Sequence, residues 1–152
     1  MIHVKKILYP TDFSSYSNQA YFHAITLAEH HGASLTILYV YAPEEGKGAE
    51  ETRQARNYWR NQLEQIRPVD PSIAVHHVFL EGDPATEIVR FGKDATVDLI
   101  VMGTHGRTGL DRLLLGSVAE QVLREASCSV LIVKLPKGSP AAAKPDVAMA
   151  AK

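Results

Sequence analysis

Glycines and a hydroxyl group gather between residues 103 and 117, where the chain passes from an apolar run to a helical pattern. Gly103, Gly106 and Gly116 are separated by two and nine residues, and Ser117 follows at the start of the expected helix. Glycine lets a backbone approach a ligand closely, and successive loop N–H groups form an anion-binding concavity. A helix start attracts phosphate through its free N–H groups and its dipole. With the guanidinium of Arg107 in the same segment, these residues together predict a polyphosphate ligand.

A simpler interpretation of the same residues needs no ligand. Ser117 and Glu120 have the spacing of a capping box, in which two side chains close the start of a helix. The end of a strand explains Gly103 equally well, because glycine is a usual residue of turns. The chain also lacks the G-x-x-x-x-G-K-[ST] string of the standard phosphate loop, and the glycine spacing is not the G-x-G-x-x-G of dinucleotide sites. Only the combination of glycines on one strand-to-helix connection favours a ligand.

Other reactive side chains have ordinary structural explanations. The adjacent pairs His30-His31 and His76-His77 do not share a face of a helix or strand, so neither pair is expected to chelate a metal. Cys128 has no base beside it and is expected to be inert. Trp59, at helical spacing, is expected in the core or in an interface. His105 has no orienting carboxylate nearby in sequence, which favours a neutral hydrogen-bonding role over a general base.

The elements that position these residues alternate along the chain. Short apolar runs predict five strands, at residues 5–10, 33–41, 73–80, 98–103 and 129–134. Helical spacing predicts four helices between them, the first over residues 15–31 and the last over 117–126. Gly32 predicts the end of the first helix, and Asp83 before Pro84 predicts the start of the third. This alternation predicts a parallel sheet with right-handed crossovers and helices on both faces.

Two segments meet in such a sheet when the first and fourth strands are its central neighbours. Ligands of open α/β sheets bind beyond the carboxyl ends of the strands, where the winding reverses. Pro10, Thr11 and Asp12 follow the first strand, and the glycine segment follows the fourth. Asp12 also stands just before the first helix, so a role as its N-cap is the structural alternative. The last helix is expected to turn Leu123 inward.

Composition excludes several classes of function. A length of 152 residues suits one domain with its own core. Lys plus Arg is 16 and Asp plus Glu is 17, which gives no field to attract nucleic acid or an anionic membrane. One cysteine, no secretory leader and no apolar run of about 20 residues predict a cytoplasmic protein with no membrane partner. The Pro/Ala/Lys-rich residues 136–152 are expected to be a disordered tail beyond a domain of residues 1–135.

From about residue 5 to residue 134, the chain resembles the universal stress protein family. The nucleotide-binding members of that family carry G-x2-G-x9-G-[ST], which stands here as Gly103, Gly106, Gly116 and Ser117. The motif is fairly specific between an apolar strand and a helix, so the chain resembles the ATP-binding branch. The resemblance implies a three-layer open α/β fold with a five-stranded parallel sheet of order 3-2-1-4-5, like that of the adenine nucleotide alpha hydrolases.

The resemblance also implies which residues hold the nucleotide. Pro10, Thr11 and Asp12 are implied at the adenine and ribose end, where the Asp12 carboxylate accepts from ribose hydroxyls, and Val40 is implied as an adenine wall. The residues implied around the ribose and phosphates are Met102, Gly103, His105, Gly106, Arg107, Thr108, Gly116, Ser117 and Val118. A divalent ion, Mg²⁺ or Mn²⁺, is implied to ride on the phosphates, without a metal site built from protein alone.

Functions of different classes remain consistent with these residues. The favoured one is a small regulatory module of the stress response that binds ATP, AMP or ADP. It is expected to form a homodimer through the strand at residues 130–134, because natural proteins cover apolar sheet edges and the resembled family pairs this strand. The alternative is a slow nucleotide hydrolase or phosphotransferase, for which the segment offers Arg107 and Arg112 but no phosphate-loop lysine. A third interpretation is an interaction protein with an empty pocket.

Overall fold

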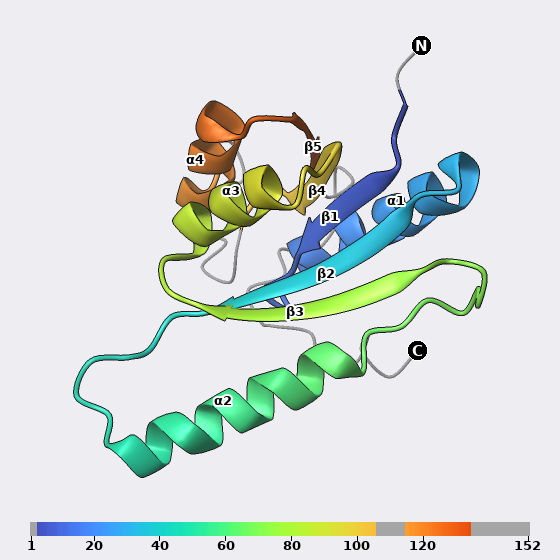
Figure 1. The fold of residues 1–152 in the computed structure, drawn as a ribbon. Helices are drawn as coiled ribbons and strands as arrows, with labels where there is room; N and C mark the ends of the chain where they lie inside the picture. Colours follow the sequence, from blue (N-terminus) through green and yellow to red (C-terminus); the bar gives the residue numbers. More distant parts are fainter. Residues whose placement is uncertain (1–2, 106–114, 135–152) are drawn as a thin grey trace.

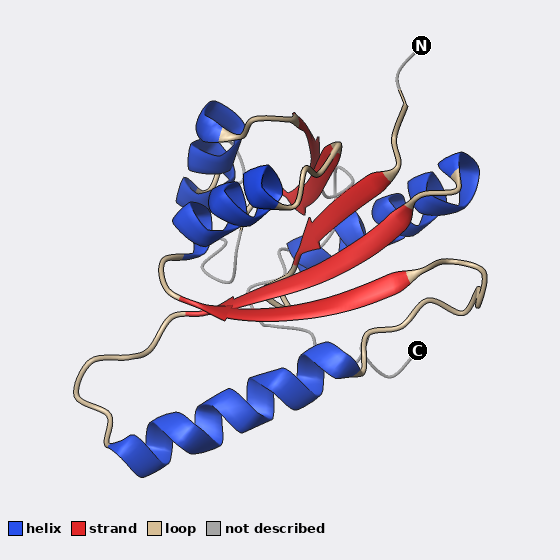
Figure 2. Ribbon diagram, in the orientation of Figure 1, coloured by secondary structure: helices blue, strands red, loops and turns tan. Residues whose placement is uncertain are grey.

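Strands and helices alternate along the chain in the computed structural model, which describes residues 3–105 and 115–134 (Figure 1, Figure 2). The strands are β1 (Lys6–Pro10), β2 (Ser34–Tyr41), β3 (Val75–Glu81), β4 (Leu99–Gly103) and β5 (Ser129–Val133). The helices are α1 (Ser15–His31), α2 (Ala49–Glu64), α3 (Pro84–Asp94) and α4 (Ser117–Glu125). Each predicted element is present, and the strand ends differ from the prediction by one or two residues. Gly106, Arg107, Thr108 and the tail lie outside the described residues.

The five strands form one parallel sheet in the order β3-β2-β1-β4-β5, as expected. β1 lies at its centre, paired with β2 from Lys6 opposite Ser34 to Pro10 opposite Leu38, and with β4 on its other side. The chain therefore winds outward in one direction through β2 and β3, and in the other through β4 and β5. This reversal beside β1 creates the switch point at which open α/β sheets bind ligands.

Helices cover both faces of the sheet, which makes three layers. α1 and α2 contribute to one buried cluster and α3 and α4 to the other, and Figure 1 shows α2 and α3 on opposite sides of the sheet. In β1, Ile7 and Tyr9 face the α1 side while Leu8 faces the α3 side, and each is at most 1% exposed. A strand buried on both faces reads as a continuous apolar run, which is why "KILYP" was recognisable in the sequence.

Side-chain caps set the ends of two helices near the pocket described below. The Ser14 hydroxyl accepts a hydrogen bond from the Ser17 N–H at 3.2 Å and caps the start of α1. Gly32 ends this helix in the left-handed region, at φ +63°, as predicted. Asp83 caps α3 and Pro84 occupies its first turn, which confirms the predicted start of that helix.

The prediction for the inner face of α4 was partly wrong. Leu123 is 49% exposed instead of buried, while Ala119 and Val122 face the core at 2% and 0% exposure. Each helical residue rotates by about 100° from the one before, so Leu123 lies about 40° from Ala119 but about 100° from Val122, at the edge of the inward stripe. An exposed leucine thus remains on the outer side of this short helix.

Candidate functional site

A cavity of about 130 Å³ opens at the carboxyl ends of β1 and β4, at the switch point. Eight of its lining residues are ones that the sequence predicted for ligand binding: Pro10, Thr11, Asp12, Val40, Met102, Gly103, His105 and Val118. The remaining lining residues are Ser17, Leu38, Pro84, Ile88 and Ala119. The two predicted segments, after β1 and after β4, therefore meet in one pocket.

The β1–α1 turn carries Asp12 to the edge of this pocket. The Thr11 N–H donates to the Leu38 carbonyl at 2.8 Å and so extends the β1–β2 pairing by one residue. Asp12 Oδ1 accepts from the Ser14 N–H at 3.0 Å, a local bond that orients the carboxylate. Since Ser14 itself caps α1, the alternative in which Asp12 is the N-cap is wrong. The Asp12 carboxylate is positioned as a pocket residue.

The backbone of Val40 faces the space beyond the end of β1. The Leu38 carbonyl points toward β1, because it accepts from Thr11, whereas the Tyr41 carbonyl accepts from Gly82 on the β3 side. Along a strand within a sheet, the N–H and C=O groups of successive residues point alternately toward the two neighbouring strands. The N–H and C=O of Val40 therefore point to the same side as those of Leu38. β1 ends at Pro10, opposite Leu38, and the N–H and C=O of Val40 therefore point past that end toward the pocket that Val40 lines.

Close packing against α1 is the reason for glycine at position 103. A Cβ on Gly103 would lie 2.6 Å from the Tyr16 carbonyl oxygen, closer than side chains tolerate. The backbone at Gly103 does not adopt the left-handed region, so neither a positive φ nor a clash with a ligand is needed to explain the residue. Gly103 still lines the pocket, and its small size lets α1 approach β4 there.

His105 lines the pocket and is buried, at 9% exposure. Its Nδ1 lies 3.1 Å from the Thr104 hydroxyl, and its ring packs against Tyr16 with centroids 5.0 Å apart. Among the described residues, its Nε2 has no hydrogen-bond partner. Buried polar atoms without a partner are uncommon, so this nitrogen is a candidate contact for a ligand that enters the pocket.

The start of α4 is held close to the end of β4. The Gly116 N–H donates to the Thr104 carbonyl at 2.7 Å, and Gly116 is the N-cap without a capping side chain. The alternative interpretation as a capping box is wrong, because Ser117 is the first helical residue and Glu120 lies 3.5 Å from Arg124 instead. Gly116 and Ser117 do not line the pocket, although Val118 and Ala119 of the same turn do. The first N–H groups of a helix have no partner within that helix, so this helix start suits an anion.

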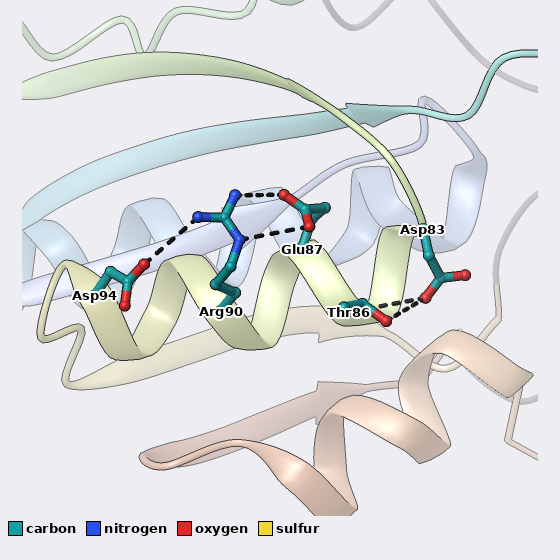
Figure 3. A network of polar contacts seen from close by, with 5 residues as sticks. All are labelled: Asp83, Thr86, Glu87, Arg90 and Asp94. Atoms are coloured by element: carbon teal, nitrogen blue, oxygen red, sulfur yellow. Dashed lines mark hydrogen bonds and ion pairs between the residues drawn. The ribbon is translucent and has the colours of Figure 1, made fainter.

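A surface network on α3 fixes the helix that supplies Pro84 and Ile88 to the pocket (Figure 3). The Asp83 carboxylate accepts from the Thr86 N–H at 3.1 Å and from its hydroxyl at 2.7 Å, and these bonds hold the pKa of Asp83 below its usual range. Arg90 pairs with Glu87 and, at 3.5 Å, with Asp94.

Five lining residues were missed by the sequence analysis, and two of them had a usable signal. Leu38 stands two residues before Val40 on the same strand face, so the strand alternation alone would have added it. Ser17 falls in the first turn of the helix that follows Asp12. Pro84, Ile88 and Ala119 come from helices on the α3 side of the sheet, whose approach to the switch point no local pattern indicates.

The structure also defines the surroundings of other reactive side chains. Trp59 packs against Phe13, with ring centroids 5.2 Å apart, as a core residue. His77 Nε2 lies 2.7 Å from the Ile66 carbonyl. Burial raises the pKa of the Cys128 thiol, which disfavours the reactive thiolate. In residues 3–105 and 115–134, no three His, Cys, Asp or Glu side chains gather as a metal site, and no helix is long and apolar enough to cross a membrane.

Known proteins match the chain across this sheet and both halves of the pocket. The model of the universal stress protein family matches residues 3–134. A universal stress protein of Methanocaldococcus jannaschii is 41% identical over 142 residues, which cover 88% of this chain and 84% of that protein.

Two solved structures have the same fold. A second protein of M. jannaschii, solved to assign its biochemical function, has a TM-score of 0.77 at 32% identity, covering 91% of this chain and 100% of its own. A universal stress protein solved in complex with cAMP has a TM-score of 0.61 at 26% identity, covering 87% of this chain and 98% of its own. With a family match that spans every strand and helix described above, this chain belongs to the universal stress protein family.

Proposed function

We propose that this protein is a regulatory module that binds an adenine nucleotide, ATP in the first place, in the switch-point pocket. One observation carries the proposal: a carboxylate, the β2 edge beyond the end of β1 and a helix start whose N-cap is a glycine converge at the carboxyl ends of β1, β2 and β4. These three features suit a ribose, a base and a phosphate, respectively. A family member solved with cAMP supports the same class of ligand.

The base end of the pocket favours adenine. The lining is mainly apolar there, with Leu38, Val40, Ile88 and Met102, and it suits a flat heterocycle. The Val40 C=O can accept from the adenine amino group while its N–H donates to the neighbouring ring nitrogen. Guanine presents a carbonyl and an N–H at the same positions. The Val40 C=O would then face a second acceptor and its N–H a second donor, and both would remain without a hydrogen bond.

The sugar and phosphates extend from the base toward α4. Asp12 accepts hydrogen bonds from ribose hydroxyls, and the N–H groups in the first turn of α4 bind phosphate oxygens. A volume of about 130 Å³ is smaller than the roughly 300–1,000 Å³ that enclose larger ligands, so the cavity holds the base end and leaves the phosphates nearer the surface. Gly106, Arg107 and Thr108 complete the phosphate contacts in this proposal, and Mg²⁺ or Mn²⁺ accompanies the phosphates.

A binding role is favoured over rapid catalysis. Phosphoryl transfer needs dense positive charge around the transferred group and a placed nucleophile or water. Among the described lining residues, Asp12 and His105 are the ones with titratable side chains, and neither is a lysine or arginine. Slow hydrolysis or phosphotransfer is the competing function, and turnover separates it from binding.

Calorimetric titration of the purified protein with ATP and GTP tests the proposal directly. ATP is expected to bind with roughly 5- to 150-fold higher affinity than GTP, because the mismatched polar contacts cost about 1–3 kcal/mol. Mass analysis of nucleotide released from the protein then identifies the ligand acquired in the cell. Failure to bind any adenine nucleotide would contradict the proposal, and turnover of many ATP molecules per minute would favour the enzyme instead.

We also propose that two copies pair through β5. This strand is at one end of the sheet and pairs only with β4 in the described chain, so its outer edge is open. Leu131 on β5 and Leu123 on α4 are 36% and 49% exposed. Open edges with exposed leucines are features that natural proteins usually cover.

A further inference from the structure

Phe13, next to Asp12, has an unusual backbone conformation. Its φ is +65°, in the left-handed region that a bulky side chain rarely adopts, and it is 1% exposed. Thr96 is the other non-glycine residue with positive φ in the described chain, and the end of α3 explains it: the Val97 N–H donates back to the Gly92 carbonyl at 2.9 Å. Phe13 precedes a helix, so its strain needs a different source of support.

A chain of buried hydroxyl groups supplies that support. Thr11 Oγ1 accepts from the Phe13 N–H at 3.0 Å and from the Ser17 hydroxyl at 2.9 Å. The Tyr9 hydroxyl donates to the Ser17 carbonyl at 2.8 Å and lies 3.0 Å from Ser17 Oγ. Tyr9, Thr11 and Ser17 are all at most 4% exposed, so water does not compete for these bonds. These hydrogen-bonded hydroxyl groups therefore join β1 to the first turn of α1 across the strained residue.

The same turn aims the carboxylate of Asp12. Asp12 stands between Thr11 and Phe13. The Thr11 hydroxyl is the last of the hydrogen-bonded hydroxyl groups, and it accepts from the Phe13 N–H. We infer that Tyr9 and Ser17 are positioning residues for nucleotide binding, holding the β1–α1 turn in the strained form that directs Asp12 toward the ribose. The inference rests on the proposed function, because it assigns a role within that site.

Tyr9 is the cleaner residue for a test, since it is fully buried and does not line the pocket, whereas Ser17 does. Burial also raises the pKa of Tyr9, which keeps its hydroxyl a neutral donor throughout the working pH range. Tyr21 provides a matched control. Its ring packs on Tyr9 with centroids 5.4 Å apart, and its buried hydroxyl has no hydrogen-bond partner among the described residues.

The experiment compares ATP with 2′,3′-dideoxy-ATP, which lacks the hydroxyls that Asp12 would bind. Calorimetry gives both dissociation constants for the full-length wild type, Tyr9→Phe, Ser17→Ala and Tyr21→Phe, and denaturant unfolding confirms that each is folded. Wild type is expected to prefer ATP. In Tyr9→Phe the affinity for ATP should fall about fivefold while that for the dideoxy compound changes little. Tyr21→Phe should retain the wild-type preference.

The outcomes are distinct. Loss of the preference in Tyr9→Phe and Ser17→Ala, with Tyr21→Phe unchanged, supports the positioning role. Equal losses for both nucleotides, or an unchanged preference in Tyr9→Phe and Ser17→Ala, overturn it while leaving the proposed function intact. If wild type binds neither nucleotide, the proposed function itself is overturned and this inference with it. Should Tyr9→Phe not fold, the comparison of Ser17→Ala with wild type decides, through the ratio of the dissociation constants for the dideoxy compound and ATP.

Discussion

Asp12 and Ser14 stand two residues apart at the β1–α1 turn and perform different tasks. Ser14 closes the start of α1 through its hydroxyl, and Asp12 lines the pocket with its carboxylate held by the Ser14 N–H. The side chain that caps α1 and the carboxylate that lines the pocket therefore belong to different residues. A substitution at Asp12 can be interpreted as a change in binding.

Asp12→Ala should weaken ATP binding and leave the fold largely unchanged. Removing the carboxylate leaves ribose hydroxyls without acceptors, which costs about 1–3 kcal/mol, or roughly 5- to 150-fold in affinity. Calorimetry measures the affinity and denaturant unfolding the stability. Wild-type affinity in this variant would mean that the ribose does not lie at Asp12.

Gly103→Ala should destabilise the protein, because the added methyl group meets the Tyr16 carbonyl oxygen at 2.6 Å. Relief requires α1 or β4 to shift, and overpacking of this kind costs about 1–3 kcal/mol. Gly92→Ala is the matched control, since its nearest new contact is an ordinary 3.5 Å to Ile100 and alanine favours the helix. Urea unfolding of both variants provides the comparison. Equal stability for Gly103→Ala and wild type would contradict the packing argument.

At the scale of elements, α3 has the most defined start. Asp83→Ala removes the carboxylate that accepts two bonds from Thr86 and should lower the free energy of unfolding at pH 7 by about 0.5–2 kcal/mol. Asp94→Ala, at the other end of the same helix, removes only an exposed pairing with Arg90 and should cost less than about 0.5 kcal/mol.

The contribution of Asp83 should also depend on pH. The Thr86 bonds depress the pKa of Asp83 in the folded state below its unfolded value of about 3.9. The stabilisation is then fully present above that value and is lost as the pH falls through the folded pKa. Denaturant unfolding of wild type and Asp83→Ala across this range should show the two curves converging in acid. A constant difference would exclude the carboxylate as the source.

The elements could be predicted from the sequence because each carries its own signal. Apolar runs marked the strands, and Asp83-Pro84 and Gly32 marked helix ends. The start of α4 at Ser117 was predicted correctly, but the alternative interpretation of Ser117 and Glu120 as a capping box was wrong, because Gly116 is the N-cap and its N–H is bonded to the Thr104 carbonyl.

The pocket was predictable where it follows the strand ends, and unpredictable where tertiary contacts decide. Pro10, Thr11 and Asp12 were found because they directly follow a strand that the topology puts at the centre. The packing role of Gly103 could not be predicted, because its neighbour Tyr16 lies far away in the sequence. Helix residues such as Ile88 reach the pocket only through the packing of the α3 layer.

At the scale of the whole molecule, the open edge of β5 leads to a prediction about assembly. Light scattering at micromolar concentration should give twice the mass of one chain, and Leu131→Lys should shift the protein toward the monomer by placing a charge in the contact. Val69→Lys, at a loop residue that is 91% exposed, should leave the mass unchanged. A wild-type monomer at this concentration would rule out pairing through β5.

The pocket is assembled from residues as distant as Pro10 and Ala119, drawn from three strands and three helices. No partly folded segment of the chain contains it, so a molecule that fills it binds the native state alone. Such a ligand at a hundred times its dissociation constant adds about 2.7 kcal/mol to the free energy of unfolding. Degradation by cellular proteases draws on transiently unfolded chains, and its rate falls with that population. The abundance of this protein would thereby follow the supply of its ligand, without any change in the rate of its synthesis.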